Sequence, residues 1–170
     1  MNRREILVSP LALAAIGCAT YDSSTYKDEP LLPGQGLLVL RINLSNTINN
    51  YDPDITIFSL SQTGTPHLHM VLKFKVGQAL RVFAIPEGTY RLGSFSVAGS
   101  TREFGNQILF SVVKDQACYV GDIDISMGTW PSFSLTIKNR INETKARFNE
   151  NYPKASALPF TSHLMIDSRV

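Results

Sequence analysis

The sequence contains few cysteines and few charged residues, and its composition does not indicate a biochemical activity. Only two of the 170 residues are cysteine, which excludes a disulfide-rich scaffold and a four-cysteine zinc site. Charged residues make up 18 %, and the 16 basic and 14 acidic residues form no block of one sign, which argues against a nucleic-acid-binding protein. The chain is nevertheless 44 % hydrophobic, so it can bury a core and is not intrinsically disordered.

The sequence also lacks the local motifs of common enzymes. It contains no Gly-x-Ser-x-Gly elbow, no phosphate-binding glycine loop, no His-Glu-x-x-His helix and no dinucleotide fingerprint. A catalytic site can still assemble from scattered residues, so an enzyme such as a hydrolase stays as a third and least favoured alternative. We expect a non-enzymatic protein that needs no cofactor.

What is present is an ordered N-terminal signal. A positively charged start precedes an apolar stretch from Ile6 to Ile16, which is too short to span a bilayer. The stretch ends in Ala15-Ile16-Gly17-Cys18, which resembles the bacterial lipobox. The resemblance implies that residues 1–17 are a lipoprotein signal peptide and that Cys18 is acylated. The alternative is a buried first helix with an incidental cysteine.

The export route and the destination follow from neighbouring residues. Asn2-Arg3-Arg4-Glu5-Ile6-Leu7 resembles a twin-arginine export signal, although the arginines also fit the general secretory route, and both routes stay open. An Asp directly after the cysteine would resemble an inner-membrane retention signal, but this sequence has Ala19 there. The resemblance therefore implies a periplasm-facing outer-membrane lipoprotein. The bilayer would then be a partner through the acyl chains on Cys18. Residues 18–35 are rich in Ser, Thr, Asp, Pro and Gly, which predicts a flexible tether.

Residues 36–138 show the alternation of apolar and polar residues that is typical of β-strands. Turn residues interrupt this alternation about every ten positions. The predicted strands are 36–44, 54–61, 67–76, 78–85, 89–98, 106–113, 117–126 and 133–138. This pattern predicts an antiparallel β-sandwich of about 7–8 strands.

The alternation of apolar and polar residues ends after Lys138. Ile141, Thr144, Phe148 and Tyr152 recur at helical spacing, which predicts one amphipathic helix over 139–153 that packs over an end of the sandwich. The tail, residues 154–170, either adds a strand or stays loose.

Two segments carry a resemblance to a known fold. The run Pro86-Glu87-Gly88-Thr89-Tyr90 between two apolar strands is similar to a hairpin of transthyretin-like and carboxypeptidase-regulatory-like sandwiches. Residues 110–112 followed by 117–123 look like a strand pair of bacterial lipoproteins of this type. The resemblance implies an immunoglobulin- or transthyretin-like sandwich in which Pro86, Gly88 and Tyr90 form a structural turn. Such a fold by itself assigns no activity.

Two groups of residues are candidates for ion binding. His67 and His69 share a strand face and are weak candidates for metal ligands, which His163 could join; the alternative is an exposed polar face. Asp122 and Asp124, together with Asp54, could form an acidic patch or a weak calcium site, whereas the alternative is a solvated strand face.

The remaining candidates are a thiol and a set of basic residues. Cys118 would lack a partner if Cys18 is acylated, so it is expected to be buried or to form an intermolecular disulfide. Four basic side chains are expected to be exposed, namely Lys73, Lys75, Arg81 and Arg91. They would either form a mildly basic face toward lipid head groups or acidic glycans, or serve ordinary solubility.

Together these observations predict an anchored interaction or structural module of the bacterial envelope. Its partner would be another envelope protein. The alternative is a periplasmic carrier for a small apolar ligand or a metal, which would need a concave pocket or a completed histidine site.

Overall fold

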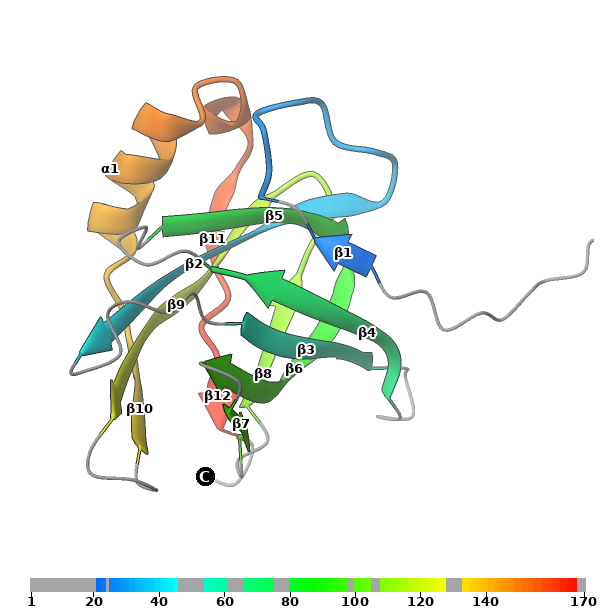
Figure 1. Cartoon of the computed structure of the whole chain (residues 1–170). Helices are drawn as coiled ribbons and strands as arrows, with labels where there is room; N and C mark the ends of the chain where they lie inside the picture. Colours follow the sequence, from blue (N-terminus) through cyan, green and yellow to red (C-terminus); the bar gives the residue numbers. More distant parts are fainter. Residues whose placement is uncertain are drawn as a thin grey trace, which may run out of the picture.

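Two β-sheets pack face to face with one helix outside them (Figure 1). The structure is a computed structural model. It describes residues 21–23, 25–45, 54–60, 66–74, 80–97, 100–104, 108–127 and 133–167. The predicted β-sandwich with a short C-terminal helix is confirmed.

The larger sheet has seven strands and is antiparallel except at one edge. Its order is β1-β4-β3-β6-β8-β12, with β7 added beside β6. The strands are β1 (Tyr21–Ser23), β3 (Asp54–Leu60), β4 (Pro66–Lys73), β6 (Gly88–Val97), β7 (Ser100–Glu103), β8 (Ile108–Val112) and β12 (Ile166–Asp167). The edge strand β1 pairs with β4 in parallel.

The smaller sheet has five strands and is mixed. Its order is β10-β9-β2-β5, with β11 beside β9. The strands are β2 (Gln35–Ser45), β5 (Leu80–Pro86), β9 (Ala117–Met127), β10 (Phe133–Lys138) and β11 (Phe160–Ser162). β2 and β9 form a parallel pair at its centre, which departs from the purely antiparallel arrangement that we expected.

All eight predicted strands are present, but four more occur. The additional strands β1, β7, β11 and β12 have two to four residues each. A period of two cannot be recognised over so few positions. These short strands form at sheet edges, where tertiary pairing rather than local sequence decides the conformation.

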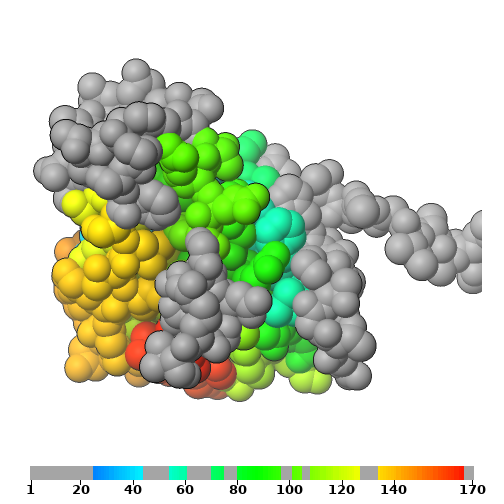
Figure 2. Space-filling view, turned by 90° about the horizontal axis from the view of Figure 1, so that it is seen from below, coloured from blue at the N-terminus to red at the C-terminus, as the bar shows by residue number. Residues whose placement is uncertain are grey.

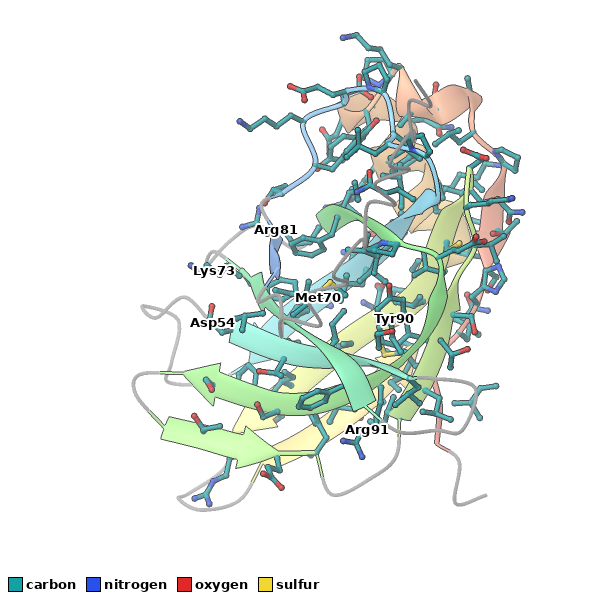
Figure 3. The ribbon with its side chains drawn as sticks, turned by 90° about the vertical axis from the view of Figure 1, so that its right-hand side faces the viewer. Asp54, Met70, Lys73, Arg81, Tyr90 and Arg91 are labelled. Carbon is teal, nitrogen blue, oxygen red and sulfur yellow. The ribbon has the colours of Figure 1, made fainter. Side chains whose placement is uncertain are left out.

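The main core fills the space between the sheets. Apolar side chains alternate toward it along each strand, as β3 shows with buried Ile55 and Ile57 between partly exposed neighbours. Met70 and Tyr90 lie inside the molecule in Figure 3 and are at most 1 % exposed. The alternation expected over 67–76 is seen at Met70 and Leu72 of β4 and at Phe74 directly after it, all of which are buried.

The predicted turn at Pro86 is a corner between the two sheets and not a hairpin. β5 pairs with β2 in the smaller sheet, whereas β6 pairs with β3 and β8 in the larger one. Gly88 has a φ of 154°, which permits the sharp change of direction. The Tyr90 hydroxyl donates a 2.5 Å hydrogen bond back to the Pro86 carbonyl and fastens the corner.

The connection from β8 to β9 also crosses between the sheets. The resemblance implied a strand pair here, but β8 belongs to the larger sheet and β9 to the smaller one. Asp115 in the turn has a φ of 56°. A strand followed by a tight turn therefore does not reveal whether the next strand pairs with it, because both arrangements need the same turn residues.

The helix α1 (Ile141–Asn151) covers the outer face of the smaller sheet and not an end of the sandwich. Thr144 and Phe148 are fully buried, and Ile141 and Tyr152 pack beside them, so the predicted apolar stripe is correct. Under the helix lies a second apolar cluster that includes Leu37.

Residues 25–34 are packed against the domain, which corrects the predicted tether. The Tyr26 amide donates to the Val82 carbonyl on the free edge of β5, and its ring lies 5.7 Å from that of Tyr152. Asp28 accepts hydrogen bonds of 3.0 and 2.9 Å from the amides of Lys154 and Ala155 at the start of the 3-10 helix η1 (Ala155–Ala157). Only residues 19 and 20 separate the predicted acylation site, Cys18, from β1.

Candidate functional site

The last described residues form a strap that connects the two sheets. In this strap, residues 160–167, β11 pairs in parallel with β9 and β12 pairs antiparallel with β8. Between them the amides of His163 and Met165 donate to the carbonyls of Tyr119 and Val120 on β9. Met165 is 6 % exposed and joins the main core. The red strap lies at the surface between yellow-orange and green segments in Figure 2.

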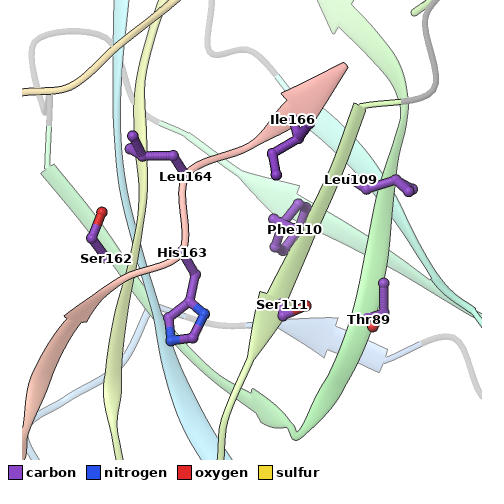
Figure 4. A pocket seen from close by; sticks show the side chains of 8 residues that line it. All are labelled: Thr89, Leu109, Phe110, Ser111, Ser162, His163, Leu164 and Ile166. Atoms are coloured by element: carbon purple, nitrogen blue, oxygen red, sulfur yellow. The ribbon is translucent and has the colours of Figure 1, made fainter. Parts of the chain in front are cut away.

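A shallow groove lies between the strap and β8 (Figure 4). Because residues 163–165 bond to β9, they stay away from the part of β8 that follows Leu109. The groove opens widely to solvent and has a volume of about 650 Å³. Its mostly apolar lining consists of Thr89, Leu109, Phe110, Ser111, Ser162, His163, Leu164 and Ile166.

The groove combines an apolar floor with a few polar groups. Ile166 is 67 % exposed. It is one of the two large apolar side chains that are most open to water among the described residues. His163 Nε2 lies 3.1 Å from the Thr161 hydroxyl, which itself lies 3.0 Å from Gln116 Oε1. Apolar lining with a small number of fixed polar groups is typical of binding sites.

The groove and β1 lie at opposite edges of the larger sheet. β1 is the first strand in its order and β12 is the last. In Figure 1, β1 lies beside β4 and away from β12.

The second candidate site is a buried charged cluster beneath α1. Asp122 on β9 is fully buried, so the expectation of a solvated strand face was wrong for this residue. Its carboxylate lies 3.4 Å from the guanidinium groups of both Arg41 and Arg140. Tyr119 donates a 2.8 Å hydrogen bond to the same carboxylate, and the Thr144 hydroxyl donates one of 3.3 Å.

This cluster attaches the helix to the sheet. Arg41 also lies 2.9 Å from Glu143 on α1, so one buried guanidinium links β2, β9 and the helix. The Arg140 amide donates to the Tyr119 hydroxyl at 2.9 Å. Burial raises the pKa of Tyr119 to about 12, which keeps the phenol protonated as a donor. These charges compensate one another, and the geometry indicates a structural role.

Asp124 lies at the solvent-accessible border of the same cluster. Burial alone would raise its pKa, but hydrogen bonds from Lys138 and Asn43 and the nearby Arg140 lower the pKa overall. Asp54, by contrast, lies at the start of β3 in the other sheet, opposite Lys73. The structure does not bring the three predicted acidic residues together.

The predicted metal ligands His67 and His69 belong to β4, with His69 opposite Phe58. Their side chains lie outside the described residues, as does all of Cys18. His163 belongs to the groove, across the larger sheet from β4. Within the described part of the chain, no group of three His, Cys, Asp or Glu residues could hold a metal ion.

Cys118 is buried, as one of the two predictions stated. Its thiol accepts a 3.2 Å hydrogen bond from the Val113 amide, and the Thr161 hydroxyl lies 3.9 Å away. Burial raises the pKa of this thiol, so the group is held in its unreactive form.

Of the four basic residues, the three that the structure describes do not form one exposed face. Arg81 is only 6 % exposed, which corrects the prediction that it is exposed. Arg91 lies 5.3 Å from the centre of the Phe58 ring on the outer face of the larger sheet. Lys73 is exposed on β4, and Lys75 lies outside the described residues.

Comparison of the chain with protein-family models, curated proteins and solved structures found no match. Among the residues that the structure describes, no helix has the length and apolar character needed to cross a membrane. The groove and the buried cluster therefore carry the functional argument on their own geometry.

Sequence reasoning missed the groove because it needs three separate segments. Thr89 is the second residue of β6, Ser111 lies in β8, and His163 lies more than 50 positions later in the strap. The one available signal was Leu164-Met165-Ile166, an apolar run in an otherwise polar tail. That run predicts burial, but it does not say beside which strand.

Proposed function

We propose that the protein is an acylated, periplasm-facing lipoprotein that acts as a non-enzymatic interaction module of the bacterial outer membrane. An extended, apolar segment of an envelope protein docks in the groove between β8 and the strap. The observation that carries this proposal is the open, mostly apolar groove with Ile166 exposed at its end.

The shape of the groove favours a chain segment over an enclosed small molecule. It opens widely to solvent along the strap, and both of its walls are extended backbone, from β8 and from residues 162–166. An extended peptide fits beside such walls, with alternate side chains on Leu109 and Leu164. Exposed apolar surface of this kind is typical of interaction sites.

The short distance between the anchor and the fold supports the same proposal. Three residues, 18–20, span at most about 11 Å when fully extended. An acylated Cys18 would thus hold the β1 edge close to the bilayer. The groove at the opposite edge would then face the periplasm, where a partner can reach it.

The test has two parts, both on the protein in its native membrane. Intact mass should give a chain that starts at Cys18 and carries acyl groups; an unmodified chain that starts at Met1 would overturn the anchor. For docking, a photo-reactive benzoylphenylalanine replaces Ser162, an exposed residue of the groove. We expect it to cross-link one envelope protein in constant stoichiometry.

A matched control uses the same photo-reactive residue at Asn149, which is exposed on α1. It should not capture that protein. Adding Leu109→Asp to the Ser162 variant puts a charge in the groove and should abolish the cross-link. Equal capture from both positions, or capture that survives Leu109→Asp, would contradict docking at the groove.

A second candidate is a carrier for a small apolar ligand. The groove volume of about 650 Å³ favours it, because small-molecule sites fall within about 300–1,000 Å³. A co-purifying ligand that raises the melting temperature of the protein, together with no cross-linked partner, would put this candidate first.

A further inference from the structure

A second surface feature of the molecule is the outer edge of β10. β10 forms the outer strand of the smaller sheet, and no strand within the described residues pairs with its other side (Figure 1). All six of its residues pair with β9 without a register shift. Such an edge presents a row of backbone donors and acceptors to another strand.

Two of the usual devices that protect an edge strand, proline and a β-bulge, are missing from β10. Its six residues contain no proline, and its ladder contains no bulge. The one charged residue is Lys138 at the end, and its ammonium group lies 2.5 Å from the Asp124 carboxylate of the same chain. That ion pair removes much of the repulsion that an edge lysine would otherwise exert.

We propose that two copies of this chain pair through their β10 strands in antiparallel fashion about a twofold axis. In such a pair, residues that lie directly opposite each other point to the same face of the sheet. The alternation of β10 places Leu135 and Ile137 toward the core, and Ser134 and Thr136 on the exposed face. Each residue therefore meets one of its own kind.

The most complementary register centres on Leu135. It places Leu135, which packs against the core, opposite Leu135 of the second copy, so the central inner pair is apolar. Ser134 then faces Thr136 of the second copy, a pair of hydroxyl side chains that is favourable between strands. Centring on Thr136 would instead place Lys138 opposite Ser134 of the second copy and bring a charge into the ladder.

The second copy is the occupant that the composition of β10 favours. An unrelated strand could use the same backbone groups, but the alternation, the apolar inner face and the neutral outer face match β10 itself. Pairing would join two five-stranded sheets into one continuous sheet across the axis. This inference is independent of the groove, because the docking proposal rests on β8 and the strap.

The first test uses cysteine cross-linking of the full-length protein in mild detergent. One sample carries Ser134→Cys, another carries Thr136→Cys, and both positions are exposed. Under mild oxidation we expect a disulfide-linked dimer when the two samples are mixed, because the substituted positions lie opposite each other. Neither sample alone should form it, and wild type reports any contribution of the native thiols.

The second test uses charge in the same register. Ser134→Lys with Thr136→Lys sets lysines against lysines and should raise the dimer dissociation constant about tenfold or more at low salt. The matched variant, Ser134→Glu with Thr136→Lys, sets opposite charges together and should keep the dimer. Both variants change only exposed side chains, so circular dichroism should stay that of wild type.

Each outcome of these two tests either supports or overturns the proposed dimer. A mixed cross-link together with dissociation of the lysine variant alone in sedimentation velocity supports the proposal. Wild type that stays monomeric up to about 100 µM, or cross-links that form equally in single samples and in the mixture, would overturn it. Capture from Ser162 would be unaffected by that failure, so the two proposals fail separately.

Discussion

At the scale of single residues, Asp122 carries the largest expected effect. Its carboxylate is fully buried and contacts Arg41, Arg140, Tyr119 and Thr144. Asp122→Asn removes the buried one of the two carboxylates that face Arg41 and leaves Glu143, and breaking a buried pair costs about 3–5 kcal/mol. Urea unfolding should show this loss in the free energy of unfolding.

Its control is a surface pair in the same chain. Arg147 and Glu143 lie 3.5 Å apart on α1 and are each about half exposed. Arg147→Ala should cost less than about 1 kcal/mol, because exposed ion pairs contribute little. Similar losses for the two variants would show that the buried cluster does not hold α1 as described.

Asp124 predicts how stability depends on pH. Its pKa in the folded protein is lowered below the ordinary value of 3.8. The carboxylate therefore contributes stability above that value, and the contribution disappears as the pH falls through the lower, folded pKa. Urea unfolding between pH 2 and 7 should show a smaller acid-dependent loss in Asp124→Asn than in wild type.

Tyr90 predicts the strength of the corner between the sheets. Tyr90→Phe keeps the ring, which stacks on Phe110 at 5.6 Å, but removes the hydrogen bond to the Pro86 carbonyl. Leaving a buried group without its partner costs about 1–3 kcal/mol. Thermal and urea unfolding should both detect the loss; an unchanged midpoint would mean that water replaces the hydroxyl.

At the scale of elements, α1 depends on the sheet for its stability. It has 11 residues, and its N-cap residue Arg140 makes no side-chain capping hydrogen bond. A helix of this length is marginal alone in water. Phe148 is fully buried against the sheet, so Phe148→Ala should cost about 3–5 kcal/mol. Far-ultraviolet circular dichroism should show loss of helix before the sandwich unfolds.

The contrast with Ala146 makes this prediction specific. Ala146 is exposed on the same helix, so Ala146→Gly weakens intrinsic helix propensity by about 1 kcal/mol without touching the sheet. If Ala146→Gly and Phe148→Ala had equal effects, propensity rather than packing would hold the helix.

Elements that bury one long face could be predicted from the sequence, and elements fixed by distant pairing could not. The alternation in β4 and the helical spacing in α1 are local, and both predictions were correct. Whether Pro86 begins a hairpin or a corner depends on which strands lie beside β5 and β6. The groove likewise depends on where the strap bonds, and the burial of Asp122 depends on a helix that begins 19 positions later.

At the scale of the whole molecule, the positions of the two edges predict an orientation. The test of this orientation, which rests on the proposed acylation of Cys18, uses the membrane-extracted protein in liposomes that carry brominated lipids, with a fluorophore on Lys73→Cys of β4 or on Ser162→Cys of the strap. Both residues are exposed. The bromine atoms should quench the Lys73 label more strongly, because β4 lies beside β1. Equal quenching would contradict a fixed orientation above the bilayer.

The parallel pairing of β2 with β9 also has a consequence for folding time. Asn43 and Asp124 bond across 81 positions of sequence, and Asp28 reaches Ala155 across 127. Contacts at such separation require the closure of long loops, which makes folding slow. A nascent chain that ends before residue 117 has no strand with which to cover this side of β2. Folding is therefore expected to be a late event that waits for nearly the whole polypeptide.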